Sequence, residues 1–239
     1  LESALAEASM NNVQRRDPNA TYNKVPFDTL RAWTPGFDWN PYAAARAMRL
    51  PDSVNVSQPQ FYRALAGLLT SRPVEDWSTY LRWRVLAQGA PMLSQAFVDL
   101  DFRFQQRLSG QQQLQPRWKR CLRMADEDLG DALGQMFVAE RFPPAAKAKA
   151  QKLVDDVESA LGARLPQLDW MSAPTQKAAL AKLDAIRDFI GYPDSWRDYK
   201  GLALKSDDLV GNRTAAQSWE LSRLMARIGG PVDKTEWRM

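Results

Sequence analysis

Residues 116–137, PRWKRCLRMADEDLGDALGQMF, form the stretch that decides how this chain folds. Apolar side chains recur along it at intervals of three and four, namely Trp118, Cys121, Leu122, Ala125, Leu129, Ala132, Leu133 and Met136. That spacing places them on one side of an α-helix. Pro116 suits a first helical turn, and Pro143-Pro144 interrupts the pattern. The stretch therefore predicts one long amphipathic helix.

The same spacing continues on both sides of this stretch. It predicts further helices over about residues 1–15, 40–50, 59–71, 73–88, 92–108, 153–165, 172–186 and 207–228. Asn40-Pro41 is a good helix start because Asn can cap free N–H groups and Pro fits the first turn. The best candidate strand is Val54-Asn55-Val56, which needs a partner. We expect a mainly α, bundle-like lobe of at least seven helices with little or no sheet.

The polar run Gln111-Gln112-Gln113, directly after Ser109-Gly110, is the best candidate for a boundary. It divides the lobe into a first part, residues 1–110, and a second part, residues 111–239, unless the two form one continuous domain. The chain opens with Leu1-Glu2-Ser3-Ala4-Leu5, which has the pattern of a helix interior. We therefore expect the chain to be part of a longer polypeptide.

Charge and hydropathy argue against two classes of partner. The 32 basic residues are interspersed with 28 acidic ones, and the densest basic stretch holds only Arg117, Lys119, Arg120 and Arg123. Nucleic-acid binders concentrate positive charge on one face, so we expect no nucleic-acid partner. No apolar run approaches the roughly 20 residues that span a bilayer, and no signal-peptide pattern is present. We expect no membrane contact from this segment.

The chain contains no histidine and a single cysteine, Cys121. Zinc sites use three or four His, Cys and carboxylate ligands, and Ser or Cys nucleophiles are usually activated by histidine. We therefore expect no catalytic, cofactor-binding or metal-ligating residue on this chain. The acidic cluster Asp126, Glu127, Asp128 and Asp131 could hold a hard cation. A solvated helix face is the better interpretation, since Arg123 can reach the acidic residues one turn away.

Three other features each leave an alternative open. Cys121 lies on the apolar side of its helix, which suits either a buried, inert thiol or a disulfide to a cysteine outside this chain. The nine tryptophans are better explained by core packing than by a ligand-stacking surface. Glycosylation sequons begin at Asn19, Asn55 and Asn212, which is compatible with export without establishing it.

Ordered blocks of this sequence resemble the neprilysin/endothelin-converting-enzyme family of zinc metallopeptidases. The family's Trp-Arg-Arg-Cys block and the helix after it are similar to Arg117-Trp118-Lys119-Arg120-Cys121-Leu122 and Ala132-Leu133-Gly134-Gln135-Met136-Phe137-Val138. Later family blocks are similar to Trp170-Met171 with Thr175, to Ile190-Gly191-Tyr192-Pro193-Asp194, and to Pro231-Val232-Asp233-Lys234-Thr235-Glu236-Trp237. In the first half, Arg16-Asp17-Pro18, Tyr22-Asn23 and Phe37-Asp38-Trp39 also fit. The resemblance covers the whole chain.

The resemblance implies a helical lobe that faces a zinc-binding lobe across a chamber admitting peptides of modest size. The family's His-Glu-x-x-His zinc helix has no counterpart in this chain, so no catalytic or metal residue carries over. Zinc, peptide substrates and the missing catalytic lobe would belong to a parent enzyme outside the cytoplasm. By resemblance, Cys121 forms a disulfide with a segment missing from this chain. The alternative function is an independent all-helical interaction domain without peptidase activity.

Overall fold

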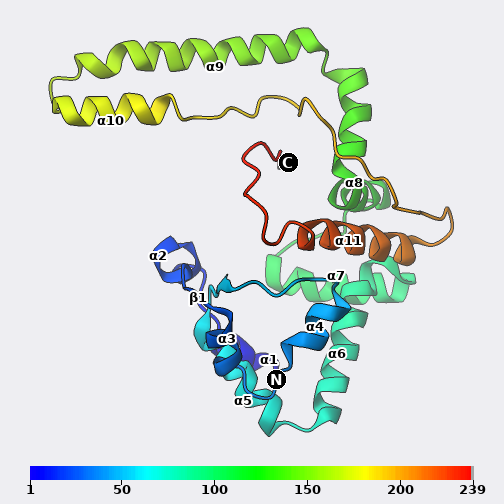
Figure 1. Cartoon of the computed structure of the whole chain (residues 1–239). Helices are drawn as coiled ribbons and strands as arrows, with labels where there is room; N and C mark the ends of the chain where they lie inside the picture. The colour runs from blue at the N-terminus through cyan, green and yellow to red at the C-terminus, as the bar shows by residue number, and fades with distance from the viewer. Residues whose placement is uncertain (238–239) are drawn as a thin grey trace. The chain divides into compact units, whose positions relative to one another are not determined.

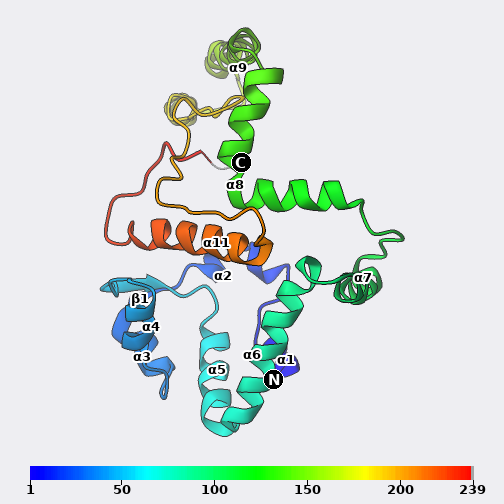
Figure 2. The same ribbon diagram turned by 90° about the vertical axis from the view of Figure 1, so that its right-hand side faces the viewer.

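The computed structural model describes residues 1–237, and within them the chain is mainly helical, as predicted (Figures 1 and 2). The α-helices are α1 (Glu2–Glu7), α2 (Pro18–Thr21), α3 (Phe27–Trp33), α4 (Trp39–Ala45), α5 (Pro59–Ser71), α6 (Val74–Gly89), α7 (Gln95–Ser109), α8 (Arg117–Arg141), α9 (Pro144–Arg164), α10 (Ala173–Leu183) and α11 (Leu209–Met225). Short 3₁₀ turns cover Gln14–Arg16, Ala90–Met92 and Leu165–Gln167.

The described residues contain one small sheet, which supplies the partner that the predicted strand needed. Strands β1 (Lys24–Pro26) and β2 (Ser53–Asn55) pair antiparallel, with Val25 opposite Val54. The expectation of little sheet is confirmed.

The chain divides into two compact units. The first unit is Leu1–Leu114 with Leu202–Val232, and the second is Gln115–Gly201 with the described residues from Asp233 onward. Residues 202–232, which include α11, thus group with the N-terminal part of the chain. The division into 1–110 and 111–239 stays a prediction about how the lobe is organised.

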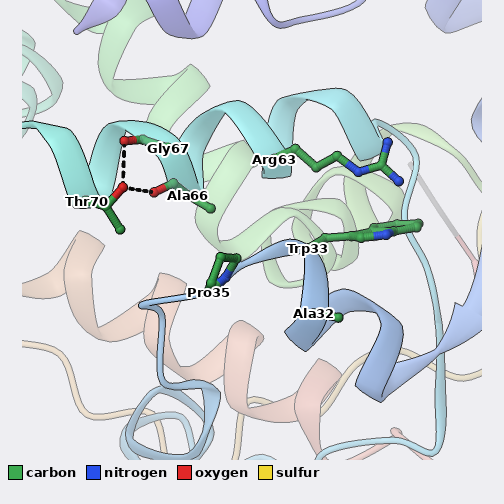
Figure 3. Close-up of a pocket in the computed structure, with 7 residues that line it drawn as sticks. All are labelled: Ala32, Trp33, Pro35, Arg63, Ala66, Gly67 and Thr70. Atoms are coloured by element: carbon green, nitrogen blue, oxygen red, sulfur yellow. Dashed lines mark hydrogen bonds between the residues drawn. The ribbon is translucent and has the colours of Figure 1, made fainter.

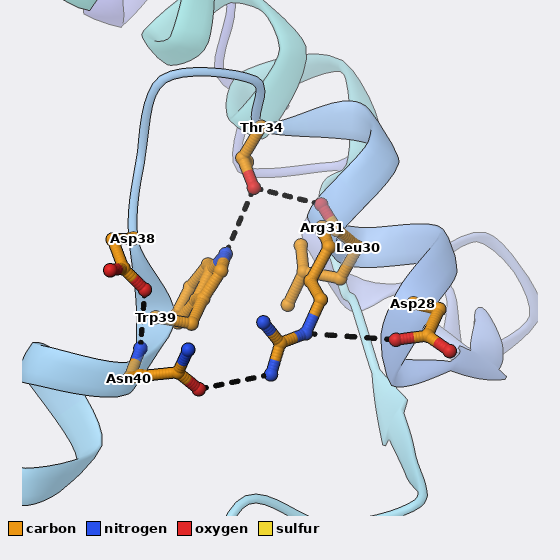
Figure 4. Close-up of polar contacts among 7 residues, drawn as sticks. All are labelled: Asp28, Leu30, Arg31, Thr34, Asp38, Trp39 and Asn40. Carbon is orange, nitrogen blue, oxygen red and sulfur yellow. Dashed lines mark hydrogen bonds and ion pairs between the residues drawn. The ribbon is translucent and has the colours of Figure 1, made fainter.

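The core of the first unit lies between the small sheet, α3 and α5. Phe27, Leu30 and Val56 are its buried centre, and partly buried side chains pack around them, including Trp33, Trp39 and Tyr62. The buried hydroxyl of Thr34 donates to the carbonyl of Leu30 at 2.8 Å and accepts from the indole N–H of Trp39 at 2.9 Å (Figure 4). This pair of hydrogen bonds ties the end of α3 to the start of α4.

Two details of the helix predictions are wrong: the residue that caps α4 and the residue at which the first helix ends. The cap of α4 is Asp38, whose carboxylate accepts from the backbone N–H of Asn40, while the Asn40 side chain accepts from Arg31 (Figure 4). The first helix ends at Glu7, well before residue 15. The Asn11 side chain accepts from the backbone N–H groups of Val13 and Gln14. Such local bonds compete with a continuing helix.

In the second unit, α9 and α10 lie side by side as an antiparallel pair (Figure 1). The turn at residues 190–194 is anchored to the start of α9, because the ammonium of Lys147 donates to the carbonyl of Tyr192 and to Asp194, both at 2.7 Å. The Tyr192 ring meets the Phe142 ring edge-on at 5.8 Å between centroids. Residues 190–194, one of the blocks that resemble the family, therefore pack against the start of α9.

Candidate functional site

No cluster of metal ligands stands out in the part of the chain that the structure describes. Within residues 1–237, no group of three or more His, Cys, Asp or Glu side chains is placed to hold a metal ion. The carboxylate of Asp131, one member of the predicted acidic cluster, accepts from the backbone N–H of Arg197 at 2.9 Å. Asp131 is thus a structural hydrogen-bond acceptor.

The most distinctive local feature is a sharp bend in α8 (Figure 2). Leu129 leaves the helical region, with φ −137° and ψ 33°, so two helical arms meet there. At the start of the second arm, backbone N–H groups cannot bond to the carbonyl groups four residues earlier, as they would in a continuous helix. Two of them, the N–H groups of Asp131 and Ala132, approach the phenol of Tyr199. Burial raises the pKa of the Tyr199 phenol, and these donors partly oppose the rise.

A concave groove of about 740 Å³ runs along both arms of the bent helix. Trp118, Leu122 and Arg123 line it from the first arm, and Leu133, Gly134 and Phe137 from the second. Its two aromatic side chains are well exposed, Trp118 at 63% and Phe137 at 61%. We call this surface the elbow groove.

Positive charge lies at the first arm of the elbow groove. The guanidinium of Arg123 donates to the side-chain oxygen of Gln115 at 2.7 Å, and the ammonium of Lys119 lies 5.4 Å from the centre of the Trp118 ring. Asp126 is the carboxylate that lines the same groove. Neither Lys119 nor Arg123 forms an ion pair within residues 1–237.

A smaller pocket of about 350 Å³ lies between α3 and α5 (Figure 3). The Arg63 guanidinium lies over the Trp33 ring, 4.5 Å from its centre, and the small residues Ala66 and Gly67 line the pocket beside them. The Thr70 hydroxyl lies within 3.3 Å and 3.0 Å of the carbonyls of Ala66 and Gly67, so its proton is already committed. This pocket offers a stacked cation and no second free polar group.

Several residues singled out in the sequence are exposed. Cys121 is a free, exposed thiol, so the interpretation as a buried core cysteine is wrong, and its disulfide to a segment outside the chain stays a prediction. Trp118 and Trp170 are exposed as well, so core packing does not explain them within this chain. The predicted apolar side supplies only Trp118, Leu122 and Leu133 of the groove lining, and the spacing gave no sign of the bend.

The three sequon asparagines differ in how the fold uses them. Both ends of the Asn55 amide are hydrogen-bonded, accepting from the N–H of Asn23 and donating to the carbonyl of Thr21. Asn212 bridges both backbone groups of Lys205 in the same way. Asn19 is exposed and lies at the start of α2. At Asn55 and Asn212 a glycan would be attached to a nitrogen that already donates a hydrogen bond.

Known proteins resemble this chain over its whole length. The model of "Peptidase family M13" matches residues 1–193. Endothelin-converting enzyme-like 1 of Rattus norvegicus is 34% identical over 99% of this chain and 32% of its own length, and Neprilysin-2 of Drosophila melanogaster is 29% identical over 99% and 34%. The chain thus spans about a third of the length of these curated relatives.

Solved structures agree with the sequence relatives. The Mycobacterium tuberculosis zinc metalloprotease Zmp1 in its open state is 39% identical, with a TM-score of 0.90 over 100% of this chain and 37% of that one. The same protein in complex with an inhibitor is 38% identical, with a TM-score of 0.87 over 100% and 36%.

Proposed function

Because the chain belongs to peptidase family M13, we propose that it forms a non-catalytic helical lobe of a neprilysin-like zinc metalloendopeptidase. In this role its helices are walls of a chamber in which the whole enzyme hydrolyses peptides. The lobe positions and admits substrate, and the chemistry belongs to another part of the polypeptide.

The observation that carries this proposal is the large solvent-accessible surface of the lobe. The chain exposes 17,855 Å² of surface. Two separate compact domains of the sizes of the two units would expose only about 13,000 Å² together. Helices α6, α7, α8 and α9 all carry exposed large hydrophobic side chains, among them Leu81, Phe104, Phe137 and Leu153. Such surface is typical of a part that packs against another.

The residues of this chain do not fit a zinc ion. The sequence has no histidine and one cysteine, and the described residues bring no ligand cluster together. We therefore assign zinc and the hydrolytic step to the part of the polypeptide outside residues 1–239.

The proposal has consequences for partners and location. Peptides would be the substrates of the whole enzyme, and the direct partner of this lobe would be the catalytic lobe of the same polypeptide. We place the enzyme outside the cytoplasm. No helix among residues 1–237 has the length and apolar character needed to cross a membrane.

The test is zinc and activity in the polypeptide that the gene encodes, compared with the isolated chain. We expect the encoded polypeptide to bind one zinc and to cleave short peptides far faster than folded proteins, with activity lost to a chelator. The isolated chain should bind no zinc. A reading frame without His-Glu-x-x-His, or stoichiometric zinc on the isolated chain, would favour the alternative of an independent helical interaction domain.

A further inference from the structure

One face of α5 forms the floor of the pocket between α3 and α5, and it carries a cation. The α5 residues that line the pocket recur at intervals of three and four, so they lie on the same side of the helix. They are Arg63, Ala66, Gly67 and Thr70. The Arg63 guanidinium lies over the ring of Trp33, 4.5 Å from its centre (Figure 3). Stacking on an aromatic face leaves the edge of a guanidinium, with its N–H donors, free to bind an acceptor.

The cation in this pocket has no counterion within the described chain. None of the ion pairs formed within residues 1–237 includes Arg63. Arg63 is also the only charged side chain among the seven described residues that line the pocket, and the proton of Thr70 is committed within α5. The pocket therefore offers one positive charge and a mainly apolar lining, which complements a ligand with one negative charge and an apolar body.

Gly67 keeps the floor of the pocket open. It lies in the interior of α5, where glycine is less favourable than alanine. A Cβ added at Gly67 would meet no atom within 4 Å, so packing within the described chain does not require glycine here. Because Gly67 lines the pocket, a large side chain at this position would occupy the space into which a ligand would fit.

We propose that this pocket of about 350 Å³ binds a small carboxylate with an apolar or aromatic body. The two carboxylate oxygens would accept from the edge of the Arg63 guanidinium, which matches a carboxylate in shape. A phosphate fits less well, because its second charge and further oxygens would face apolar lining. The carboxylate belongs either to a free acid or to the end of a peptide, which share the chemistry that Arg63 recognises. This site goes beyond the proposed function, because α3 and α5 both belong to the first unit and take no part in hydrolysis.

Titration of the polypeptide that the gene encodes with matched probes, followed by ligand-observed NMR, tests the site. The probes 3-phenylpropionate and N-acetylphenylalanine carry the carboxylate as a free acid and as a mimic of a peptide end. The corresponding amides, 3-phenylpropanamide and N-acetylphenylalaninamide, are their uncharged controls. Probes of this size bind weakly, so we expect saturation with a Kd of about 1 mM. Each amide should bind about five- to tenfold more weakly than its acid.

Variants with matched controls locate the binding. Gly67→Leu should fill the pocket and abolish binding, whereas Gly89→Leu, at another helical glycine with nothing within 4 Å of an added Cβ, should leave it unchanged. Arg63→Gln should weaken binding about five- to tenfold. Arg82→Gln, at another exposed arginine, should not. Arg63→Lys keeps the charge without the planar fork and should have an intermediate effect. If circular dichroism shows that Gly67→Leu does not fold, the two Arg63 variants carry the test.

Three results overturn the proposal: no saturable binding of either acid, equal binding of acids and amides, or acid binding that both Gly67→Leu and Arg63→Gln leave unchanged. Displacement of the acids by an equal concentration of inorganic phosphate would also overturn it. Tighter binding of 3-phenylpropionate identifies a free acid as the ligand, and tighter binding of N-acetylphenylalanine a peptide end. Equal binding of the two acids supports their shared chemistry. The readout needs neither zinc nor activity, so this proposal and the proposed function fail separately.

Discussion

Gly191 is required by both its backbone conformation and its surroundings. Its φ is +74°, and an added Cβ would lie 2.7 Å from a carbon of the Phe142 ring. Gly201 has a similar φ of +85° with nothing within 4 Å of an added Cβ. We expect Gly191→Ala to lower the free energy of unfolding by about 2–4 kcal/mol, and Gly201→Ala by only about 1 kcal/mol. Denaturant unfolding measures both, and equal losses would contradict the close contact with Phe142.

The hydrogen bond between Trp39 and Thr34 gives a second test at the scale of a residue. Trp39→Phe removes the N–H that the buried Thr34 hydroxyl accepts, and Thr34 is only 3% exposed. We expect a loss of about 1–3 kcal/mol in the free energy of unfolding. Trp170→Phe, at a side chain 72% exposed, should change it by less than about 0.5 kcal/mol. A loss as small for Trp39→Phe would show that the bond contributes little.

The residue scale also shows what the sequence can predict. Polar residues before a helix announce a cap, but Asn40 and Asp38 are equally good cap residues by type, so the sequence alone does not choose between them. Apolar residues at helical spacing announce one side of a helix. Whether that side is covered depends on a neighbour, which is why Trp118 and Cys121 are exposed despite their spacing.

At the scale of an element, Tyr199 can be tested as a cap of the second arm of α8. Tyr199→Phe removes the phenol oxygen that the N–H groups of Asp131 and Ala132 approach, so we expect a loss of about 0.5–1.5 kcal/mol at neutral pH and faster amide hydrogen exchange just after Leu129. Trp118→Phe, remote from these N–H groups on the first arm, is the control for exchange. Unchanged exchange after Leu129 would rule out the capping role.

The raised pKa of Tyr199 predicts a pH dependence for the same variant. The folded state holds the phenol proton more tightly than the unfolded state, whose pKa is about 10. This contribution is fully present below that pH and is lost as pH rises through the higher folded-state pKa. We therefore expect the destabilisation of the wild-type chain above pH 10 to be smaller in Tyr199→Phe. Parallel stability curves from pH 9 to 11 would contradict it.

Helices were predictable as elements because their apolar periodicity is local: α5, α6 and α7 match their predicted ranges closely, whereas α9 begins at Pro144, well before the predicted start at residue 153. The bend in α8 was not, because the same apolar spacing continues through Leu129 without interruption. The groups that contact the second arm, Tyr199 and the N–H of Arg197, lie far away in the sequence. The elbow groove lies along both arms of the bent helix, so neither its concave form nor the place of Phe137 in its lining could be predicted from the apolar spacing.

At the scale of the whole molecule, Cys121 reports on what covers the lobe. The thiol is exposed in this chain, and we expect a disulfide to a segment outside it in the longer polypeptide. Thiol titration under denaturing, non-reducing conditions should find Cys121 reactive in the isolated chain and unreactive in the longer polypeptide. Loop-entropy arguments put the value of such a bond at about 2–4 kcal/mol. Equal reactivity in both would leave Cys121 as an unpaired cysteine.

The contacts from Arg197 and Tyr199 to α8 can form only late in protein synthesis. Tyr199 leaves the ribosome 70 residues after Leu129, which at roughly 5–20 residues per second is a delay of about 4–14 s. During that interval the contacts of Arg197 and Tyr199 with the second arm are absent. An uninterrupted helix through Leu129 can form within microseconds. We therefore expect a straight α8 to be accessible to the nascent chain before the bent form is held. A pause in translation just upstream of residue 197 would prolong the straight form.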